Sequence, residues 1–172
     1  IESATVIYTF LPIEFKHGKR VYNQEEFLSV DSLFFQTMGI PLLEGNVKDL
    51  SMPNVVFMSQ SFARKVFGGD NPMGKTLLWN GQNEAMVKGI YADIPENNSY
   101  RPQAVISMAS LGFRKDWLSG GCTTSLVRLK EGADAEYINQ RVNPMLSNYI
   151  PMDDHYSKNV QVKEIRVSIG PL

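Results

Sequence analysis

The chain has 172 residues, and 43% of them are hydrophobic, which is enough for one domain with a substantial core or a domain with two lobes. Seventeen Lys and Arg against eighteen Asp and Glu give a net charge of -1, with no run of either sign, which argues against nucleic acid as a partner. The single cysteine, Cys122, excludes an internal disulfide and a cysteine-based metal cluster. No apolar stretch approaches the roughly 20 residues that span a bilayer as a helix.

The first 40 residues predict an antiparallel pair of strands followed by a short helix. Ser3–Phe10 and Arg20–Val30 are rich in β-branched and aromatic residues, and the turn-like Lys16–Lys19 is expected to join them. Asp31 is placed to cap a short helix that ends at Gly39.

The next 50 residues predict a strand, a helix and a hairpin. After a loop, Asn54–Ser59 is a short apolar strand, and apolar residues at helical spacing then predict a helix that Gly68 and Gly69 end. Asn80-Gly81 is a strong hairpin-turn signal between two β-type runs. The helical residues expected to pack into the core are Phe62, Val66 and Phe67.

Residues Gly69 to Thr76 spell Gly-x-x-x-x-Gly-Lys-Thr, the pattern of a phosphate-binding loop. Such a loop needs a strand before it and a helix after it, whose free N–H groups bind phosphate. Here the predicted order is helix, loop, strand, and Pro72 removes one N–H from the loop. We therefore predict a turn that binds no nucleotide at Lys75.

The second half predicts further short strands and one long helix. A turn-rich loop at Pro95–Pro102 precedes strands at Ala104–Met108 and Thr123–Leu129. The longest predicted helix lies in Gly132–Ile150, and Asn159–Ile169 is the last predicted strand. This alternation of helices, hairpins and single strands indicates an α+β fold without internal repeats.

The sequence has few side chains suited to catalysis or metal binding. His17 and His155 both lie in polar, turn-like contexts, and Cys122 has no cationic neighbour in sequence to lower its pKa. Asp153–Tyr156 contains two carboxylates and an imidazole, but adjacent residues in a loop rarely converge on one cation, so a solvated turn is favoured. No catalytic, cofactor-binding or metal-binding residue is predicted.

Three motifs between Val55 and Ser99 resemble the MacB-like periplasmic core domain of FtsX-like ABC transporter permeases. They are the helix "SQSFARKVFG", the turn "NPMGK" and the segment "VKGIYADIP", in the order and spacing of that family. Upstream, "VDSLFFQTMGIPLLEG" is similar to another stretch of the family, with Asn46 where Arg is usual. The resemblance covers the whole chain, most weakly at Gly112–Thr123. The motif residues, expected to be structural, are Ser59, Ala63, Phe67, Gly68, Asn71, Pro72, Gly74, Lys75, Gly89, Asp93 and Pro95.

The resemblance implies a two-lobed α+β periplasmic core domain. One lobe, residues 1–50 with 123–172, would be a porter-like β-α-β unit, and residues 51–122 would form an inserted, mainly β lobe. The domain would lie between the first two transmembrane helices of a permease, at the periplasmic face of the bacterial inner membrane. It would relay ATP-driven motion to an exported substrate or partner without chemistry of its own.

The implied partners are the chain's own transmembrane helices, a second permease copy or paralogue, a cytoplasmic ATP-binding subunit and a periplasmic adaptor protein. The isolated domain is expected to be monomeric. The alternative function is an extracytoplasmic sensor or ligand-binding domain of a membrane receptor, and an enzyme ranks third. Three further membrane spans downstream would indicate a permease, whereas one span followed by a signalling domain would indicate a sensor.

Overall fold

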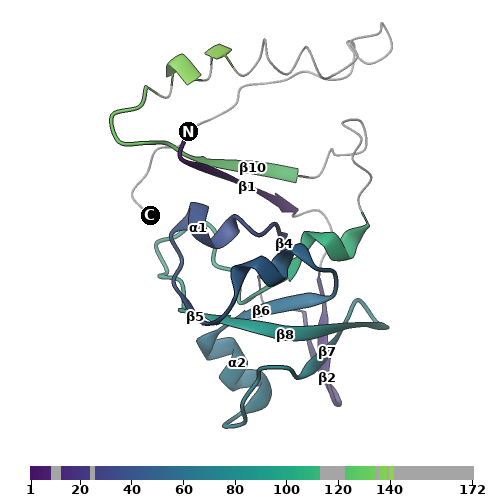
Figure 1. The fold of residues 1–172 in the computed structure, drawn as a ribbon. Coiled ribbons are helices and arrows are strands. Elements are labelled where there is room, and N and C mark those ends of the chain that lie inside the picture. The colour runs from purple at the N-terminus through teal and green to yellow at the C-terminus, as the bar shows by residue number, and fades with distance from the viewer. Residues whose placement is uncertain (9–12, 24–25, 113–122, 135, 139, 142–172) are drawn as a thin grey trace, which may run out of the picture.

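The structure is a computed structural model, and it describes residues 1–8, 13–23, 26–112, 123–134, 136–138 and 140–141. Within these ranges, ten strands form one mixed sheet in the order β10-β1-β4-β9-β6-β8-β7-β2-β3, with β5 paired to β8 (Figure 1). The strands are β1 (Ser3–Tyr8), β2 (Phe15–His17), β3 (Arg20–Tyr22), β4 (Phe27–Val30), β5 (Leu42–Gly45), β6 (Val55–Ser59), β7 (Thr76–Trp79), β8 (Asn83–Tyr91), β9 (Ala104–Ser107) and β10 (Thr123–Arg128). The helices are α1 (Phe34–Met38), α2 (Gln60–Phe67) and the 3-10 helices η1 (Val47–Ser51) and η2 (Met108–Leu111). None of the helices in these ranges is long and apolar enough to span a membrane.

The centre of the sheet is covered on both faces. In β6 every residue is buried, and the side chains alternate between two hydrophobic clusters. Val56 and Met58 pack with residues of α2, whereas Val55 and Phe57 pack with residues of α1 and η1. A strand with apolar neighbours on both sides reads as a continuous hydrophobic run, which explains the sequence VVFM.

The middle of the chain folds as its sequence predicts. β6 leads directly into α2, and after the turn at Gly69–Thr76 the β7–β8 hairpin brings β8 parallel to β6. The hairpin turn has positive φ angles at Asn80 (44°) and Gly81 (91°), the combination for which Asn-Gly is the favoured pair. Phe62, Val66 and Phe67 are buried, as predicted.

β1 and β10 form a two-stranded ribbon at one end of the sheet, which we call the β1–β10 ribbon (Figure 1). Its strands share six residue pairs, and among the described residues Ile7 and Tyr8 also pair with β4. One face of the ribbon packs on α1 through Ile7 and Leu126. Asp31 adds a polar link, because its carboxylate accepts hydrogen bonds from the Thr5 hydroxyl (2.6 Å) and the Val6 N–H (3.2 Å).

The prediction of one strand over Arg20–Val30 is wrong. β3 lies at the outer edge of the sheet and β4 lies in its interior, and the turn at Lys16–Lys19 closes a small β2–β3 hairpin. The antiparallel pairing of β1 with the end of this segment is correct. Four consecutive polar residues from Asn23 to Glu26 interrupt the apolar alternation and separate the two strands. β5 and η1 occupy a stretch predicted to be a loop.

The predicted α+β class is confirmed by a large mixed sheet with few helices. The sheet crosses the proposed boundary between lobes, since β4 pairs with β9. Because much of the porter-like lobe lies outside the described residues, the division into lobes stays a prediction. Most of the long helix, the last strand, Cys122, His155 and Asp153–Tyr156 also lie outside them.

Candidate functional site

The family motifs converge on the first turn of α2. The first N–H groups of a helix have no partner within the helix and need acceptors from elsewhere. Ser59 Oγ accepts from the Phe62 N–H (3.3 Å), and Asp93 Oδ1, from the segment after β8, accepts from the Ser61 N–H (3.0 Å). The Ser59 and Ser61 hydroxyl oxygens lie 3.4 Å apart. Two motifs distant in sequence thus meet at one helix terminus.

Asp93 is ionised at neutral pH in this arrangement. Partial burial raises the pKa of Asp93, but hydrogen bonds from the Ser61 N–H and from the Ser61 and Ser59 hydroxyls lower it, and so does the positive charge of Arg64. The net effect is a pKa below the ordinary value of 3.8. A fixed negative charge therefore stands at the positive end of α2, where it is favourable.

Other motif residues shape the end of α2. Ala63 and Phe67 are buried, and Gly68 ends the helix with a φ of 65° while its N–H donates to the Arg64 carbonyl. The Phe67 ring centroid lies 4.7 Å from that of His17. The Lys75 ammonium lies 5.2 Å from the Phe67 centroid, so Phe67 joins the end of α2 to the following turn.

The segment Gly69–Thr76 is a closed turn between α2 and β7, as predicted. Asn71 Oδ1 accepts from Met73 N–H (2.9 Å), Gly74 N–H donates to the Val87 carbonyl (2.9 Å), and Lys75 N–H donates to the Pro72 carbonyl (3.1 Å). These N–H groups are therefore not oriented toward a common phosphate. The Lys75 ammonium is paired with Asp70 at 2.7 Å, and this pairing lowers the Asp70 pKa.

Gly89 is a packing position. A Cβ atom at Gly89 would lie 2.4 Å from the ring of Phe57, which is fully buried on the neighbouring strand. Pro95 lies in the loop after β8, where its carbonyl accepts from the Asn98 N–H (3.1 Å) and closes a turn. The three motif residues from Gly89 to Pro95 therefore have different roles: Gly89 allows close packing, Asp93 caps α2, and Pro95 closes a turn.

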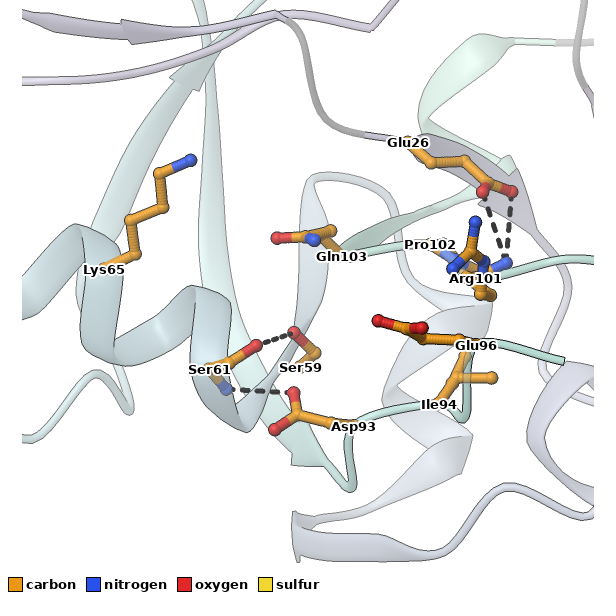
Figure 2. Close-up of a pocket in the computed structure, with 10 residues that line it drawn as sticks. All are labelled: Glu26, Ser59, Ser61, Lys65, Asp93, Ile94, Glu96, Arg101, Pro102 and Gln103. Atoms are coloured by element: carbon orange, nitrogen blue, oxygen red, sulfur yellow. Dashed lines mark hydrogen bonds between the residues drawn. The ribbon is translucent and has the colours of Figure 1, made fainter. Parts of the chain in front are cut away.

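Above the first turn of α2 the structure has an open polar cleft of about 560 Å³, which we call the Asp93 cleft (Figure 2). It lies where β6 and β8 end and where β9 and β4 begin. Eight of its ten lining residues are polar or charged. The lining residues are Glu26, Ser59, Ser61, Lys65, Asp93, Ile94, Glu96, Arg101, Pro102 and Gln103.

The floor of the Asp93 cleft is held by backbone hydrogen bonds. Gln103 N–H donates to the Glu26 carbonyl (2.7 Å), and the Gln103 carbonyl accepts from Ser59 N–H (2.8 Å), which ties β4, β9 and β6 together. The Glu26 carboxylate accepts from Arg101 N–H at 3.2 and 3.3 Å. The buried Tyr91 hydroxyl donates to the Pro102 carbonyl (2.7 Å), and burial raises the Tyr91 pKa.

Two side chains that line the cleft extend into it and have no partner in the part of the chain that the structure describes. In Figure 2 the Gln103 amide and the Glu96 carboxylate both reach into the space beside Ser59 and Ser61. Neither side chain hydrogen-bonds or pairs with another described residue. Of the eleven motif residues, Ser59 and Asp93 line the cleft. Ser61 and Lys65 lie at exposed positions of α2, and the other lining residues lie near strand ends and turns, so their convergence on one cleft gave no signal in the sequence. Within the described ranges no group of three His, Cys, Asp or Glu side chains could hold a metal ion.

The fold is similar to those of several solved permease domains. A domain of a permease protein from Porphyromonas gingivalis has a TM-score of 0.74 at 20% identity, with 89% of this chain and 72% of that one covered. The periplasmic region of MacB from Actinobacillus actinomycetemcomitans gives 0.62 at 17% identity, with 86% and 67% covered. The extracellular domain of the noncanonic ABC-type transporter YknZ from Gram-positive bacteria gives 0.55 at 17% identity, with 79% and 68% covered. At sequence identities of 17–20%, these similarities establish a shared fold.

A comparison with curated protein sequences gave no match. The family model of the MacB-like periplasmic core domain matches residues 1–145, which include β1 to β10 and all eleven motif residues. The chain therefore belongs to the MacB-like periplasmic core domains, the periplasmic part of MacB-like and FtsX-like ABC transporter permeases.

Proposed function

We propose that this domain relays motion driven by cytoplasmic ATP hydrolysis to an exported substrate or a periplasmic partner. The observation that carries the proposal is the family match over residues 1–145. A periplasmic domain of a permease lies on the far side of the membrane from ATP, so it takes part in transport through its movement. It performs no covalent chemistry of its own, and ATP hydrolysis belongs to a separate cytoplasmic subunit or domain.

The sheet supports such a relay. Hydrogen-bonded strands connect β1 through β4 and β9 to β6, whose last residue, Ser59, lines the Asp93 cleft. Strands that are closely packed on both faces of a sheet deform little, so a displacement of one strand also moves the strands beside it. Among the described residues, the β1–β10 ribbon pairs with the rest of the sheet at Ile7 and Tyr8 and is also held by contacts with α1 and Asp31, so a displacement of the ribbon would reach the central strands through these contacts.

The proposed setting is the periplasmic face of the bacterial inner membrane. The partners are the protein's own transmembrane helices, a second permease copy or paralogue, a cytoplasmic ATP-binding subunit and a periplasmic adaptor protein. A net charge of -1 gives no strong electrostatic drive for self-association, so the isolated chain is expected to be monomeric. The family match favours this role over a receptor sensor.

A distance measurement in the complete permease tests the relay. With Cys122 replaced by Ser, the exposed Gln82 at the β7–β8 hairpin is changed to Cys and labelled in both permease copies. Mg·ATP added to the permease and its ATP-binding subunit in lipid nanodiscs should change the distance between the two labels, and Mg·ADP should restore it. An identical distance distribution in both nucleotide states, with ATP hydrolysis intact, would overturn the relay.

A further inference from the structure

The Asp93 cleft is suited to a polar occupant. Its volume of about 560 Å³ lies within the ~300–1,000 Å³ typical of ligand pockets, but only Ile94 and Pro102 among its lining residues are apolar. An acyl chain or an apolar compound would strip water from polar groups without replacing their hydrogen bonds, which is unfavourable. A group that donates and accepts hydrogen bonds fits this lining.

The charges of the cleft favour a cation. The first turn of a helix commonly attracts anions, but the Ser61 and Phe62 N–H groups are already bonded to Asp93 and Ser59. An anion placed there would meet the Asp93 carboxylate. The three carboxylates of the lining, Glu26, Asp93 and Glu96, outnumber the two cations, Lys65 and Arg101.

The acceptors are arranged around the open space. Glu96 and Gln103 extend into it and have no partner among the described residues, so an incoming donor would satisfy them. Asp93 is held negative at the base by its hydrogen bonds from Ser61. The Lys65 ammonium lies 5.9 Å from the Tyr22 ring centroid, which draws this cation toward an aromatic ring. A guanidinium, with its planar set of donors, matches two acceptors better than an ammonium does.

The geometry points to the Asp93 cleft as a docking site for an arginine-bearing segment of a periplasmic partner protein. This inference rests on the proposed function, because it specifies the partner contact of that domain. Glu26, Ser61, Glu96 and Arg101 are exposed, so the cleft covers one side of a ligand and leaves the other side accessible. Such a shape accommodates a side chain presented by a larger surface. Exposed charge pairs give weak and reversible binding, as a partner released in each transport cycle requires.

A titration of the ¹⁵N-labelled 172-residue chain with blocked tripeptides, followed by amide chemical shifts, tests the site. The probe is acetyl-Gly-Arg-Gly-amide, and the two controls are the same peptide with uncharged citrulline or with glutamate in place of arginine. The arginine peptide should cause saturable shifts at Ser61, Glu96 and Gln103 with a dissociation constant of the order of millimolar. The citrulline and glutamate peptides should bind more weakly.

Two isosteric variants locate the interaction. Glu96→Gln removes a charge from the cleft, and Glu84→Gln removes one from an exposed position on β8 outside it. Glu96→Gln should weaken binding of the arginine peptide about two- to fivefold, and Glu84→Gln should leave it unchanged. Both positions are exposed, so neither variant is expected to unfold the chain.

Several outcomes overturn the inference. Equal binding of the citrulline peptide, tighter binding of the glutamate peptide, or equal effects of both variants would show that the cleft does not select a cation. Much tighter binding of Gly-Arg-Gly with free termini would indicate a small exported peptide instead of a partner protein. The arginine peptide could cause no saturable shifts while the distance between labels at position 82 still changes with nucleotide. That result would exclude the cleft as the docking site and leave the proposed relay intact.

Discussion

The central strands and the β1–β10 ribbon are held by different means. β6 has buried residues throughout and pairs with β8 over five positions, whereas β10 lies at the end of the described sheet and none of its residues is fully buried. Covering both faces of a strand removes more apolar area from water than covering one face, and stability scales with that area. The central strands should therefore open only on global unfolding, while the ribbon can open locally.

The motif residues follow the same division. All eleven lie between the end of β6 and the loop after β8, and none lies in the ribbon. The motifs thus describe how α2, the following turn and the β7–β8 hairpin pack together and support the Asp93 cleft. Variants in the two regions should show whether this difference in packing is also a difference in stability.

Removing a core ring from the central region should have the largest effect. Phe62 on α2 is fully buried and contacts the rings of Tyr22 (5.4 Å between centroids) and Phe27 (5.2 Å). Phe62→Ala should lower the free energy of unfolding by ~3–5 kcal/mol, measured by urea denaturation. The exposed Val21→Ala should change it by less than about 0.5 kcal/mol. Equal midpoints for the two variants would show that the α2 face does not stabilise the fold.

A methyl group at Gly89 should give the next largest effect. Its Cβ would meet the Phe57 ring at 2.4 Å, so either the ring or β8 must move. Gly89→Ala should cost about 1–3 kcal/mol by thermal or urea unfolding. Gly69→Ala is the matched control, because Gly69 has no atom within 4 Å of the added position and no positive φ. A Gly89→Ala protein as stable as the control would show that Phe57 repacks freely.

Replacing Asp31 should destabilise the β1–β10 ribbon and leave the stability of the central strands unchanged. Its carboxylate accepts from the Thr5 hydroxyl, the Val6 N–H and the Leu33 N–H, and hydrogen bonds to charged groups each contribute more than neutral ones. Asp31→Ala should lower the opening free energy of the ribbon amides by about 1–2 kcal/mol in hydrogen exchange. The amides of β6 and β8 should keep their protection. Uniform loss of protection across the sheet would mean that the ribbon and the centre are one cooperative unit.

Much of the central region could be predicted from its sequence because its signals are local. The apolar spacing from Phe62 to Phe67 and the pair Asn80-Gly81 each specify their own element within a few residues. The ribbon and the cleft depend on long-range pairing. Nothing near Phe27 in sequence indicates that it pairs in parallel with Ala104, so the split between β3 and β4 was missed.

The cleft was missed for a related reason. Glu96, Arg101 and Gln103 lie in a turn-rich stretch where no periodicity distinguishes a lining residue from any other exposed polar residue. Asp93 could be found only as a motif position, and its role as a cap of α2 depends on a contact across 32 residues. Local patterns therefore predicted the supports of the candidate site, and tertiary structure was needed to assemble its lining.

The contribution of Asp93 should depend on pH. Because its folded pKa lies below the ordinary value of 3.8, the ionised carboxylate stabilises the fold above about pH 4, and this stabilisation fades as pH falls through the folded pKa. Asp93→Asn should therefore be slightly less stable than the natural protein at pH 7, and the difference should shrink below about pH 4. Urea denaturation at both pH values measures it. A difference that stays constant down to pH 2.5 would show that the Asp93 charge does not act through its contact with α2.

The smallest effect is expected where the sequence spells a phosphate loop. Calorimetric titration of the chain with Mg·ATP should give no saturable heat, for natural protein and Lys75→Ala alike. The N–H groups of Met73, Gly74 and Lys75 already donate to a side-chain amide and to two carbonyls, and the Lys75 ammonium pairs with Asp70. A strand, not a helix, follows the turn, so no helix terminus is available to bind phosphate. Micromolar binding that disappears in Lys75→Ala would mean that the turn opens to hold a nucleotide, and α2 and β7 would then no longer belong to the rigid centre of the sheet.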